Sequence, residues 1–195
     1  VVARDAGIDP SGDRFLAKVE KSVEFERLLR RVRRATKPVL SSRHAFTLAE
    51  SDLNPEGMTF DPRGNRFLFG SMTKSKIMQC DAAGNCRQFA APEQNGLAEV
   101  LGIAVSPLDG SIWAASNSAT TASLFHFEPD GKLIARHDLS RKPDPHLFND
   151  VVVDANGNAY STDTSGRTVY WVARESGRLE PLIPGLRIVA ANGIA

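Results

Sequence analysis

The sequence predicts an all-β fold for most of the chain, because short apolar runs alternate with turn signals and the pattern recurs at a fixed interval. After Pro38, the apolar runs are separated by turns rich in Gly, Asp and Asn. These turns are DPRGN, DAAGN, SPLDG, EPDG, DANGN and ESG. Regularly spaced short strands bounded by such turns are typical of all-β domains.

The repeat becomes visible when three stretches are aligned. EGMTFDPRGNRFLFGS, LGIAVSPLDGSIWAAS and NDVVVDANGNAYSTDT begin at residues 56, 101 and 149, and NGIA begins a fourth copy at residue 192. A second strand–turn–strand segment follows each full copy. Four strands in about 45 residues is the size of one β-propeller blade. We therefore predict a partial β-propeller over residues 41–195, with three blades and the start of a fourth. Because propellers have about four to eight blades, we expect the domain to continue in a longer protein.

Residues 1–40 are predicted to form an N-terminal helical extension. Apolar residues at helical spacing predict a helix over residues 11–35, with Ser11 as its N-cap. Arginines gather at the C-terminal end of this helix, where cations complement the helix dipole. They are Arg30, Arg31, Arg33 and Arg34. We expect a solvated helix end here; an anionic surface is the alternative. The EFERLLRRV part resembles the last helix of a tandem helical-repeat array, which suggests a protein partner for this segment.

The overall charge and hydropathy give no reason to expect a nucleic acid or a membrane as partner. A formal net charge of +1 gives no electrostatic reason to expect a nucleic acid or a membrane surface as partner. No apolar run approaches the roughly 20 residues that a membrane-spanning helix needs. No signal-peptide pattern follows Val1. The compartment stays open between the cytoplasm and a secreted or periplasmic location, with the signal outside this chain.

Two cysteines flank the five-residue turn in CDAAGNC. If this turn joins two antiparallel strands, Cys80 and Cys86 face each other within reach of a disulfide. The alternative is a pair of reduced, small apolar side chains. Two cysteines alone do not make a zinc site.

The first residues of the repeats define the candidate functional site. The innermost strands of a propeller line its central channel, so equivalent positions converge on one axis. These positions hold Glu56, Leu101, Asn149 and Asn192. A carboxylate and two amides favour a hard cation such as Ca²⁺, which takes six to eight oxygen ligands, over zinc, which prefers His or Cys. Leu101 is expected to supply an apolar wall. The alternative is that these polar side chains hydrogen-bond the backbone at the strand starts.

At these positions the sequence resembles the SMP-30/gluconolactonase/LRE-like family, with strictosidine-synthase-like and paraoxonase-like proteins as similar relatives. The stretches NPEGMTFDP, NDVVVDANGNAYSTD and ANGIA carry the resemblance, which covers residues 46–195. It implies a six-bladed propeller with one Ca²⁺ or similar divalent ion in the channel. The family's metal-binding Glu and two Asn fall on Glu56, Asn149 and Asn192. A further metal-binding Asp of the family would lie beyond Ala195.

The resemblance also implies an activity. Members are typically lactonases or phosphotriesterase-like hydrolases, and some have no hydrolytic activity. The implied reaction is metal-assisted hydrolysis, in which the cation polarises a carbonyl or phosphoryl oxygen. Sugar lactonases of the family tend to carry an Arg two residues before the Asn, where this chain has Leu147. A more apolar small-molecule substrate is therefore expected.

His146 is the candidate general base, because it lies three residues before Asn149 and histidine titrates near neutral pH. The alternative is an exposed loop histidine after KPDP. Asp150 is expected to orient Asn149 or to cap the backbone. The other three histidines lack motif context and are expected at the surface: His44, His126 and His137. No serine-hydrolase, nucleotide-phosphate or dinucleotide glycine motif is present in the sequence.

Two other functions stay open. The propeller could be a non-catalytic binding platform, scaffold or sensor with a structural metal, since fold does not fix function. A strictosidine-synthase-like condensation would instead need a catalytic Glu in a later part of the fold, outside this chain.

Overall fold

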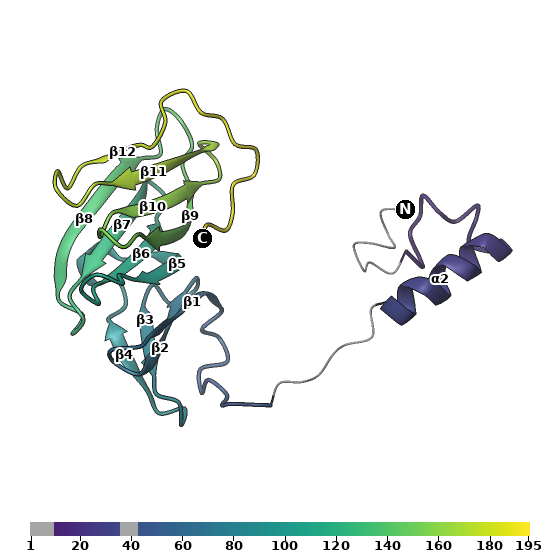
Figure 1. The fold of residues 1–195 in the computed structure, drawn as a ribbon, viewed down its shortest axis with the longest axis horizontal. Coiled ribbons are helices and arrows are strands. Elements are labelled where there is room, and N and C mark those ends of the chain that lie inside the picture. The colour runs from purple at the N-terminus through teal and green to yellow at the C-terminus, as the bar shows by residue number, and fades with distance from the viewer. Residues whose placement is uncertain (1–9, 36–42) are drawn as a thin grey trace. The chain divides into compact units, whose positions relative to one another are not determined.

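The computed structural model describes residues 10–35 and 43–195. They fall into two compact units, with the boundary between His44 and Ala45. The first unit contains one α-helix and the second is built from β-sheets (Figure 1).

The helix of the first unit, α2 (Val23–Ala35), is shorter than predicted. The Ser22 hydroxyl accepts a hydrogen bond of 3.1 Å from the Phe25 N–H, so Ser22 is the N-cap. The prediction of helix over 11–22 was wrong, and these residues form successive turns. One reason is Gly12, whose φ of 78° lies in the left-handed region that a right-handed helix does not use. No helix among the described residues is long and apolar enough to cross a membrane.

One side of α2 is buried and the other carries the arginines. Phe25, Leu29 and Val32 are buried within the first unit. The expected solvated helix end is confirmed, because the C-terminal arginines are exposed. Arg30 also lies 3.6 Å from the Glu26 carboxylate one turn earlier, an exposed pair that contributes little stability.

The second unit consists of three antiparallel four-stranded sheets, each in chain order. Sheet A is made of β1 (Pro55–Asp61), β2 (Arg66–Ser71), β3 (Ile77–Cys80) and β4 (Cys86–Ala90). Sheet B is made of β5 (Glu99–Val105), β6 (Ile112–Asn117), β7 (Thr121–Phe127) and β8 (Leu133–Ser140). Sheet C is made of β9 (Phe148–Val153), β10 (Ala159–Asp163), β11 (Thr168–Val172) and β12 (Leu179–Pro181). A short 3₁₀ turn, Gln94–Gly96, links sheets A and B.

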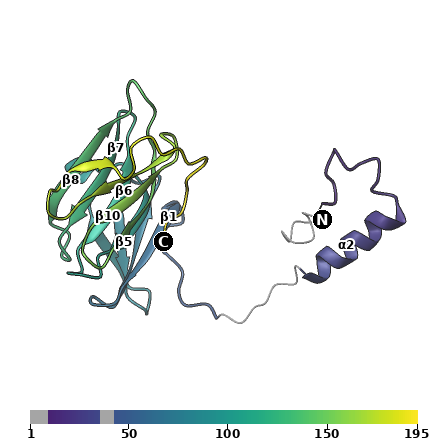
Figure 2. The same ribbon diagram turned by 45° about the horizontal axis from the view of Figure 1, so that its top comes forward.

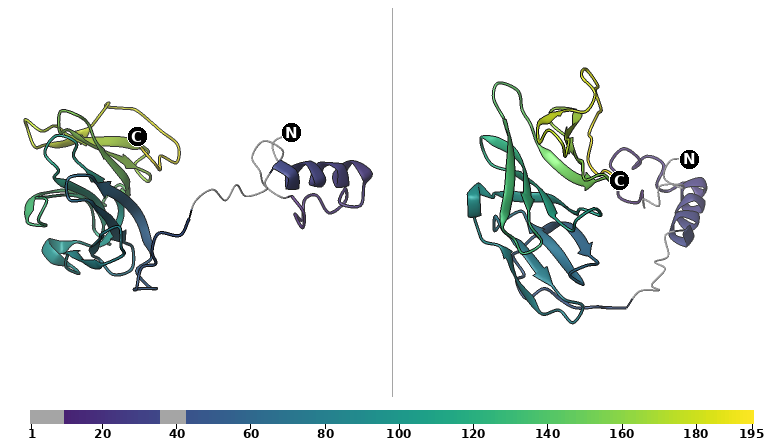
Figure 3. Two further views of the ribbon diagram at one scale, coloured as in Figure 1. Left: turned by 60° about the horizontal axis from the view of Figure 1, so that its bottom comes forward. Right: turned by 60° about the vertical axis from the view of Figure 1, so that its left-hand side comes forward.

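The sheets are arranged as successive blades. The first strand of each, β1, β5 and β9, packs beside the first strand of the next sheet, and these three strands gather near the C-terminus (Figures 1 and 2). The later strands of each sheet fan outward from them (Figure 3). This arrangement confirms the predicted partial β-propeller, with one sheet for each full copy of the repeat.

Two apolar layers hold the blades together. The layer between sheets A and B includes Leu68, Ile77, Val100, Phe125 and Phe127. The layer between sheets B and C includes Trp113, Leu124, Phe148, Val151 and Val172. Most of these side chains are buried almost completely, and burial of such residues is the main stabilising contribution to folding.

Arg66 fills the polar end of the seam between sheets A and B. Its guanidinium donates to the Asp61 carboxylate at 2.9 Å, to Gln79 Oε1 at 2.5 Å and to the Pro129 carbonyl at 2.6 Å. Burial of Asp61 alone would raise the pKa of its carboxyl, but hydrogen bonds from the Gly64 N–H and Arg66 hold that pKa below its usual value. A single side chain thus satisfies groups from two blades.

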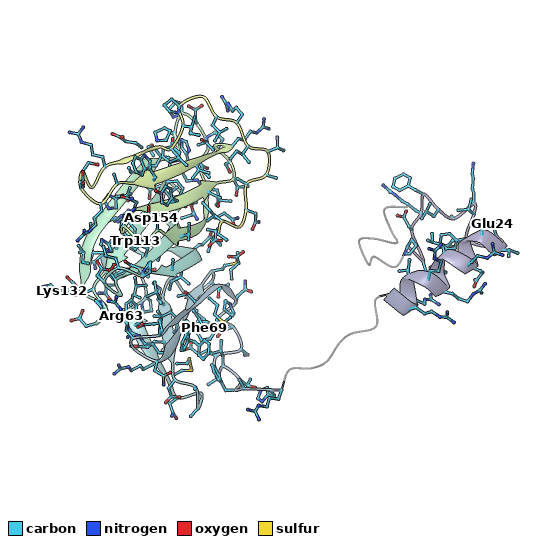
Figure 4. All side chains as sticks on the ribbon, viewed as in Figure 1. Glu24, Arg63, Phe69, Trp113, Lys132 and Asp154 are labelled. Atoms are coloured by element: carbon cyan, nitrogen blue, oxygen red, sulfur yellow. A yellow bond between two sulfur atoms is a disulfide. The ribbon has the colours of Figure 1, made fainter. Side chains whose placement is uncertain are left out.

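Arg63 makes a second link across the same seam. Its guanidinium donates to the carbonyls of Pro107 and Leu108, at 3.0 and 2.9 Å, in the first turn of sheet B. Arg63 lies in the first turn of sheet A and is labelled in Figure 4. These hydrogen bonds therefore connect the first turn of sheet A to the first turn of sheet B, in addition to the contacts between the strands.

The seam between sheets B and C has a different composition. The rings of His126 and His137 lie nearly parallel to the Trp113 indole, with centroids 4.1 and 5.8 Å from it. His126 and His137 were expected at the surface, but both are half-buried, because they lie on the face of sheet B that also carries Trp113. His44, in contrast, is exposed as expected.

Cys80 and Cys86 form a disulfide in the structure. The two residues are partners across β3 and β4, as the hairpin alternative required. The bridge closes the turn of this outer hairpin of sheet A.

We expect Arg66→Met to destabilise the protein by about 3 kcal/mol, because it leaves the buried Asp61 carboxylate without its cation and Gln79 without its donor. Urea unfolding followed by circular dichroism measures this change. Arg87→Met on the exposed part of β4 is the matched control and should change stability by less than about 0.5 kcal/mol. Equal effects of the two variants would contradict the assigned role of Arg66.

We expect acidification to weaken the protein partly through His126. The pKa of His126 is lowered from 6.5 to about 4, mainly by burial; Asp109 opposes this shift and the positive charge of His137 adds to it. Since the folded pKa lies below the unfolded value, the contribution to stability is complete above pH 6.5 and is lost as the pH falls toward 4. Unfolding titrations at several pH values measure this slope. His126→Phe keeps a ring beside Trp113 and should reduce the slope; an unchanged slope would refute the assignment.

Candidate functional site

Each inner strand begins with an irregularity in its pairing at the same repeat position. The register of β1 with β2 shifts between Pro55 and Met58, which places Glu56 in the irregular segment. The register of β5 with β6 shifts between Val100 and Gly102. In sheet C the shift lies opposite residues 148–151 of β9. Bulges bend a strand and redirect its side chains, and they are frequent next to functional sites.

Glycines allow the inner strands to approach closely at these bulges. A Cβ at Gly57 would lie 2.5 Å from the Leu101 carbonyl oxygen, and a Cβ at Gly102 would lie 2.6 Å from the Asp150 Cα. Real side chains do not tolerate such contacts with backbone. The two glycines therefore set the spacing of β1, β5 and β9 where the predicted site residues lie.

Glu56 is exposed at the start of β1. Partial burial raises the pKa of its carboxyl, and the negative charge of Asp150 raises it further. Among the described residues, no lysine or arginine forms an ion pair with Glu56. The carboxylates of Glu56 and Asp150 thus repel each other, and neither forms an ion pair with a lysine or arginine among the described residues.

Asp150 caps the backbone, which was one of its two expected roles. One carboxylate oxygen accepts from the Val151 N–H at 2.8 Å and the other from the Ile194 N–H at 3.1 Å. The second bond attaches the segment that begins the fourth repeat to β9. Its charge effect on Glu56 was missed at the sequence level, because the repeat alignment places Asp150 opposite glycines: Gly57, Gly102 and Gly193.

The segment before Ile194 is held by threonines at the end of β10. Thr162 Oγ1 donates to the Asn192 carbonyl and Thr164 Oγ1 to the Ala191 carbonyl, both at 2.5 Å. Together with Asp150, these bonds fix Asn192 beside the start of β9. The backbone of the segment that begins the fourth repeat is therefore positioned by side chains of sheet C.

The side-chain amides of Asn149 and Asn192 are not engaged by other described residues. Asn149 is half-buried and Asn192 is exposed. No group of three His, Cys, Asp or Glu side chains in residues 10–35 and 43–195 is placed to hold a metal ion. The predicted ligands Glu56, Asn149 and Asn192 carry oxygen donors, which suit a hard cation such as Ca²⁺ and not zinc.

Leu101 completes the set of equivalent positions. Its side chain is buried, with 7% exposed, and its carbonyl faces Gly57. It therefore adds an apolar contact and a carbonyl to this part of the fold rather than a charged group.

His146 is oriented by a buried carboxylate. Its Nδ1 lies 2.5 Å from Asp163 Oδ2, and Asp163 is 0% exposed. The other oxygen of Asp163 accepts from the N–H groups of Leu147 and Gly166, at 2.9 and 2.8 Å. The alternative of an exposed loop histidine was wrong, since the His146 side chain is only 14% exposed. Asp163 was missed, although its position in STDT at the end of a strand was a visible signal.

The His146–Asp163 pair has the geometry of an oriented acid–base group. A carboxylate that accepts the Nδ1 proton fixes the tautomer and leaves Nε2 as the basic atom. A cavity of about 300 Å³ lies beside His146, lined also by Asp144, Ser165, Thr168 and Arg187. None of the three predicted metal ligands lines this cavity, so the structure does not bring His146 and the Glu56 region into one pocket.

Comparisons with known proteins define the fold. No protein-family model and no curated protein matches the sequence. Among solved structures, a streptogramin B lyase is similar with 22% identity and a TM-score of 0.58, over 73% of this chain and 45% of that protein. A virginiamycin B lyase from Staphylococcus aureus has 18% identity and a TM-score of 0.57, over 72% and 45%.

A nidogen/laminin complex gives a third match, with 18% identity and a TM-score of 0.59, over 76% of this chain and 56% of that one. The chain thus spans less than half the length of the two lyases. At such identities the similarity establishes a β-propeller fold. The resemblance to the SMP-30/gluconolactonase/LRE-like family stays a prediction.

We expect Gly57→Ala and Gly102→Ala each to destabilise the protein by about 2 kcal/mol or more, because the added methyl group forces two inner strands apart. Gly193→Ala is the matched control at the equivalent position, since its Cβ would meet nothing closer than 3.8 Å. Thermal unfolding measures all three variants. A Gly193→Ala effect as large as the other two would show that the close approach is not the cause.

Proposed function

We propose that this chain supplies ligands for a Ca²⁺-type cation and that the full-length protein is a metal-dependent hydrolase. In this proposal the ligands are Glu56, Asn149 and Asn192. The substrate class is a lactone or a related ester or phosphotriester. The SMP-30/gluconolactonase/LRE-like resemblance supports the class of reaction, and the donor atoms at the strand starts support the class of ion.

The observation that carries the proposal is the unbalanced charge at Glu56. Its carboxyl lies within electrostatic range of Asp150, and the two lack a protein cation among the described residues. Like charges in a partly buried place raise each other's free energy, and a bound cation reverses that effect. The amides of Asn149 and Asn192 would add neutral oxygen ligands, which Ca²⁺ accepts.

The residues have separate roles in the proposed reaction. A bound divalent ion would polarise the carbonyl or phosphoryl oxygen of the substrate. Glu56 would supply negative charge to the ion site, and Asp150 holds the start of the fourth repeat in place through the Ile194 N–H. Leu147, half-buried before β9, favours an apolar substrate group over a sugar. His146 would hold or release a proton at Nε2 while Asp163 fixes its ring.

The second candidate is a non-catalytic binding platform with a structural metal. One similar structure is a complex of nidogen with laminin, so a propeller of this shape can take part in a protein assembly. Two others are named as lyases, so the shape is also compatible with catalysis. The exposed arginines of α2 would be the contact surface for a protein partner in this second reading.

We expect Ca²⁺ to stabilise the 195-residue chain, by about 2.7 kcal/mol at a concentration 100 times the dissociation constant. Glu56→Gln should abolish most of this stabilisation because it removes the charged ligand. Glu180→Gln, an exposed carboxylate on β12, is the matched control and should leave the stabilisation intact. Thermal unfolding with Ca²⁺, with Mg²⁺ and with chelator measures these effects.

The same variants in the full-length protein separate the two functions. Turnover of lactones or phosphotriesters that chelator removes, and that Glu56→Gln abolishes, supports the hydrolase. Stabilisation by Ca²⁺ without turnover supports the platform. Equal Ca²⁺ stabilisation of the native chain and Glu56→Gln would overturn the proposed ion site.

A further inference from the structure

A cavity of about 250 Å³ lies in the seam between sheets B and C. It is at the opposite end of the inner strands from Glu56, because Ser106 follows the last residue of β5 whereas the bulges lie at the strand starts. Its lining includes Ser106, Ser111, Trp113, His126, His137 and Arg174. Trp113 is labelled in Figure 4. The cavity does not share its lining with the proposed ion site.

The repeat provides an internal comparison for this cavity. DPRGNRFL in sheet A and SPLDGSIW in sheet B align without a gap, so Asp61 corresponds to Ser106 and Arg66 to Ser111. The pairing agrees, because Asp61 pairs with Arg66 and Ser106 donates its N–H to the Ser111 carbonyl. The third strand of each sheet, β3 or β7, carries one more polar residue on the same face, and the two residues occupy equivalent positions in the repeat.

That further residue is Gln79 in sheet A and His126 in sheet B. Gln79 pairs with Leu68 on β2, and His126 pairs with the corresponding Trp113 on β6. In the seam between sheets A and B, Gln79 receives a hydrogen bond from Arg66. In the seam between sheets B and C, the position of Arg66 holds a serine, whose side chain is too short to reach His126.

The loss of the arginine leaves two buried polar atoms unsatisfied. Ser106 Oγ and His126 Nε2 are buried and have no hydrogen-bond partner in the part of the chain that the structure describes. Ser106 is only 2% exposed. It lies near enough to Asp109 to help lower the pKa of that carboxyl, but without the geometry of a hydrogen bond. Buried groups of this kind are rare in native proteins and usually mark a missing partner.

We propose that this cavity binds a guanidinium group supplied from outside the blade, in the place that the Arg66 side chain takes in the preceding seam. The two orphaned atoms stand where Asp61 and Gln79 accept hydrogen bonds from Arg66. In the tautomer protonated at Nδ1, His126 Nε2 is an acceptor.

The charge and shape of the cavity fit this planar cation. Asp109 provides a carboxylate, since hydrogen bonds from Ser111 outweigh burial and hold the pKa of Asp109 below its usual value. The nearly parallel Trp113 and His137 rings both line the cavity, and aromatic rings are favourable neighbours for a guanidinium. In the preceding seam the guanidinium carbon of Arg66 likewise lies 5.3 Å from the centroid of the Phe89 ring.

Two other occupants fit less well. A metal ion would need three suitable side chains, and no such group is placed together among the described residues. Arg174 also lines the cavity, but it forms no ion pair with Asp109 within the described chain. Its side chain lies against Gly157, where a Cβ would be 2.9 Å from Arg174 Cδ. An external guanidinium is therefore the occupant that the repeat favours.

The test uses the 195-residue chain and methylguanidinium as probe, with methylammonium as a control of equal charge. Binding is followed by heteronuclear NMR through the Trp113 indole and His126 ring signals. We expect methylguanidinium to bind at least about tenfold more tightly than methylammonium, because a planar fork satisfies several acceptors at once. Asp109→Asn should weaken binding about tenfold, whereas Asp130→Asn in the exposed β7–β8 turn should not change it.

Ser111→Arg provides the decisive variant. It should fill the cavity as Arg66 fills the preceding seam, abolish methylguanidinium binding and raise the melting temperature by a few degrees. Arg174→Ala should retain binding. Equal binding of the two probes, unchanged binding in Ser111→Arg, or binding that occurs only in Arg174→Ala would each overturn the proposal.

A second pair of probes distinguishes whether the guanidinium comes from an arginine of a protein partner or from a small molecule. A Gly-Arg-Gly peptide blocked at both ends presents the group as a protein side chain does, and methylguanidinium presents it as a free small molecule. Tighter binding of the peptide assigns the cavity to an arginine of a protein partner. Exclusion of the peptide with retention of methylguanidinium assigns it to a small metabolite.

Discussion

The architecture depends on how closely the three inner strands approach one another. At Gly57 and Gly102 the backbone of one blade lies directly against the next, and no side chain larger than a hydrogen atom fits between them. This close approach brings Glu56 of the first blade within electrostatic range of Asp150 of the third. The bulges that accompany the glycines direct the strand starts away from regular pairing. The close approach of the inner strands therefore determines both the packing of the blades and the interaction between Glu56 and Asp150.

The outer part of each seam follows a different rule. The apolar layers repeat from blade to blade, but the polar group at their end does not. Arg66 satisfies Asp61, Gln79 and a carbonyl of the next blade, whereas the next seam has a serine at that place and a stack of imidazole and indole rings instead. Repeats of this kind can diverge at one position without loss of the fold, because each seam is stabilised mainly by its own apolar contacts.

The sequence was sufficient to predict the three blades, but it was not sufficient to predict which side chains contact one another across strands. Turn signals and the repeat predicted the three sheets correctly, because strand alternation and Gly-containing turns are local properties. The start of the helix was predicted too early in the chain, because the left-handed backbone at Gly12 and the N-cap at Ser22 outweigh the helical spacing of apolar residues. His126 and Asp163 were missed for another reason. Their environments come from residues on other strands, and only the register shows that His126 faces Trp113 or that Asp163 holds His146.

One carboxylate has an unusual position in this arrangement. Asp150 influences the charge state of Glu56 and also accepts a hydrogen bond from the Ile194 N–H, so a single side chain joins the electrostatics at Glu56 to the position of the segment that begins the fourth repeat. Two equilibria that share one group are thermodynamically linked, and the linkage is reciprocal. Any event that stabilises the Asp150 charge in its present position also favours the hydrogen bond to the Ile194 N–H. By the same free energy, any contact that holds residues 191–194 in this position affects the charge state of Glu56 through Asp150.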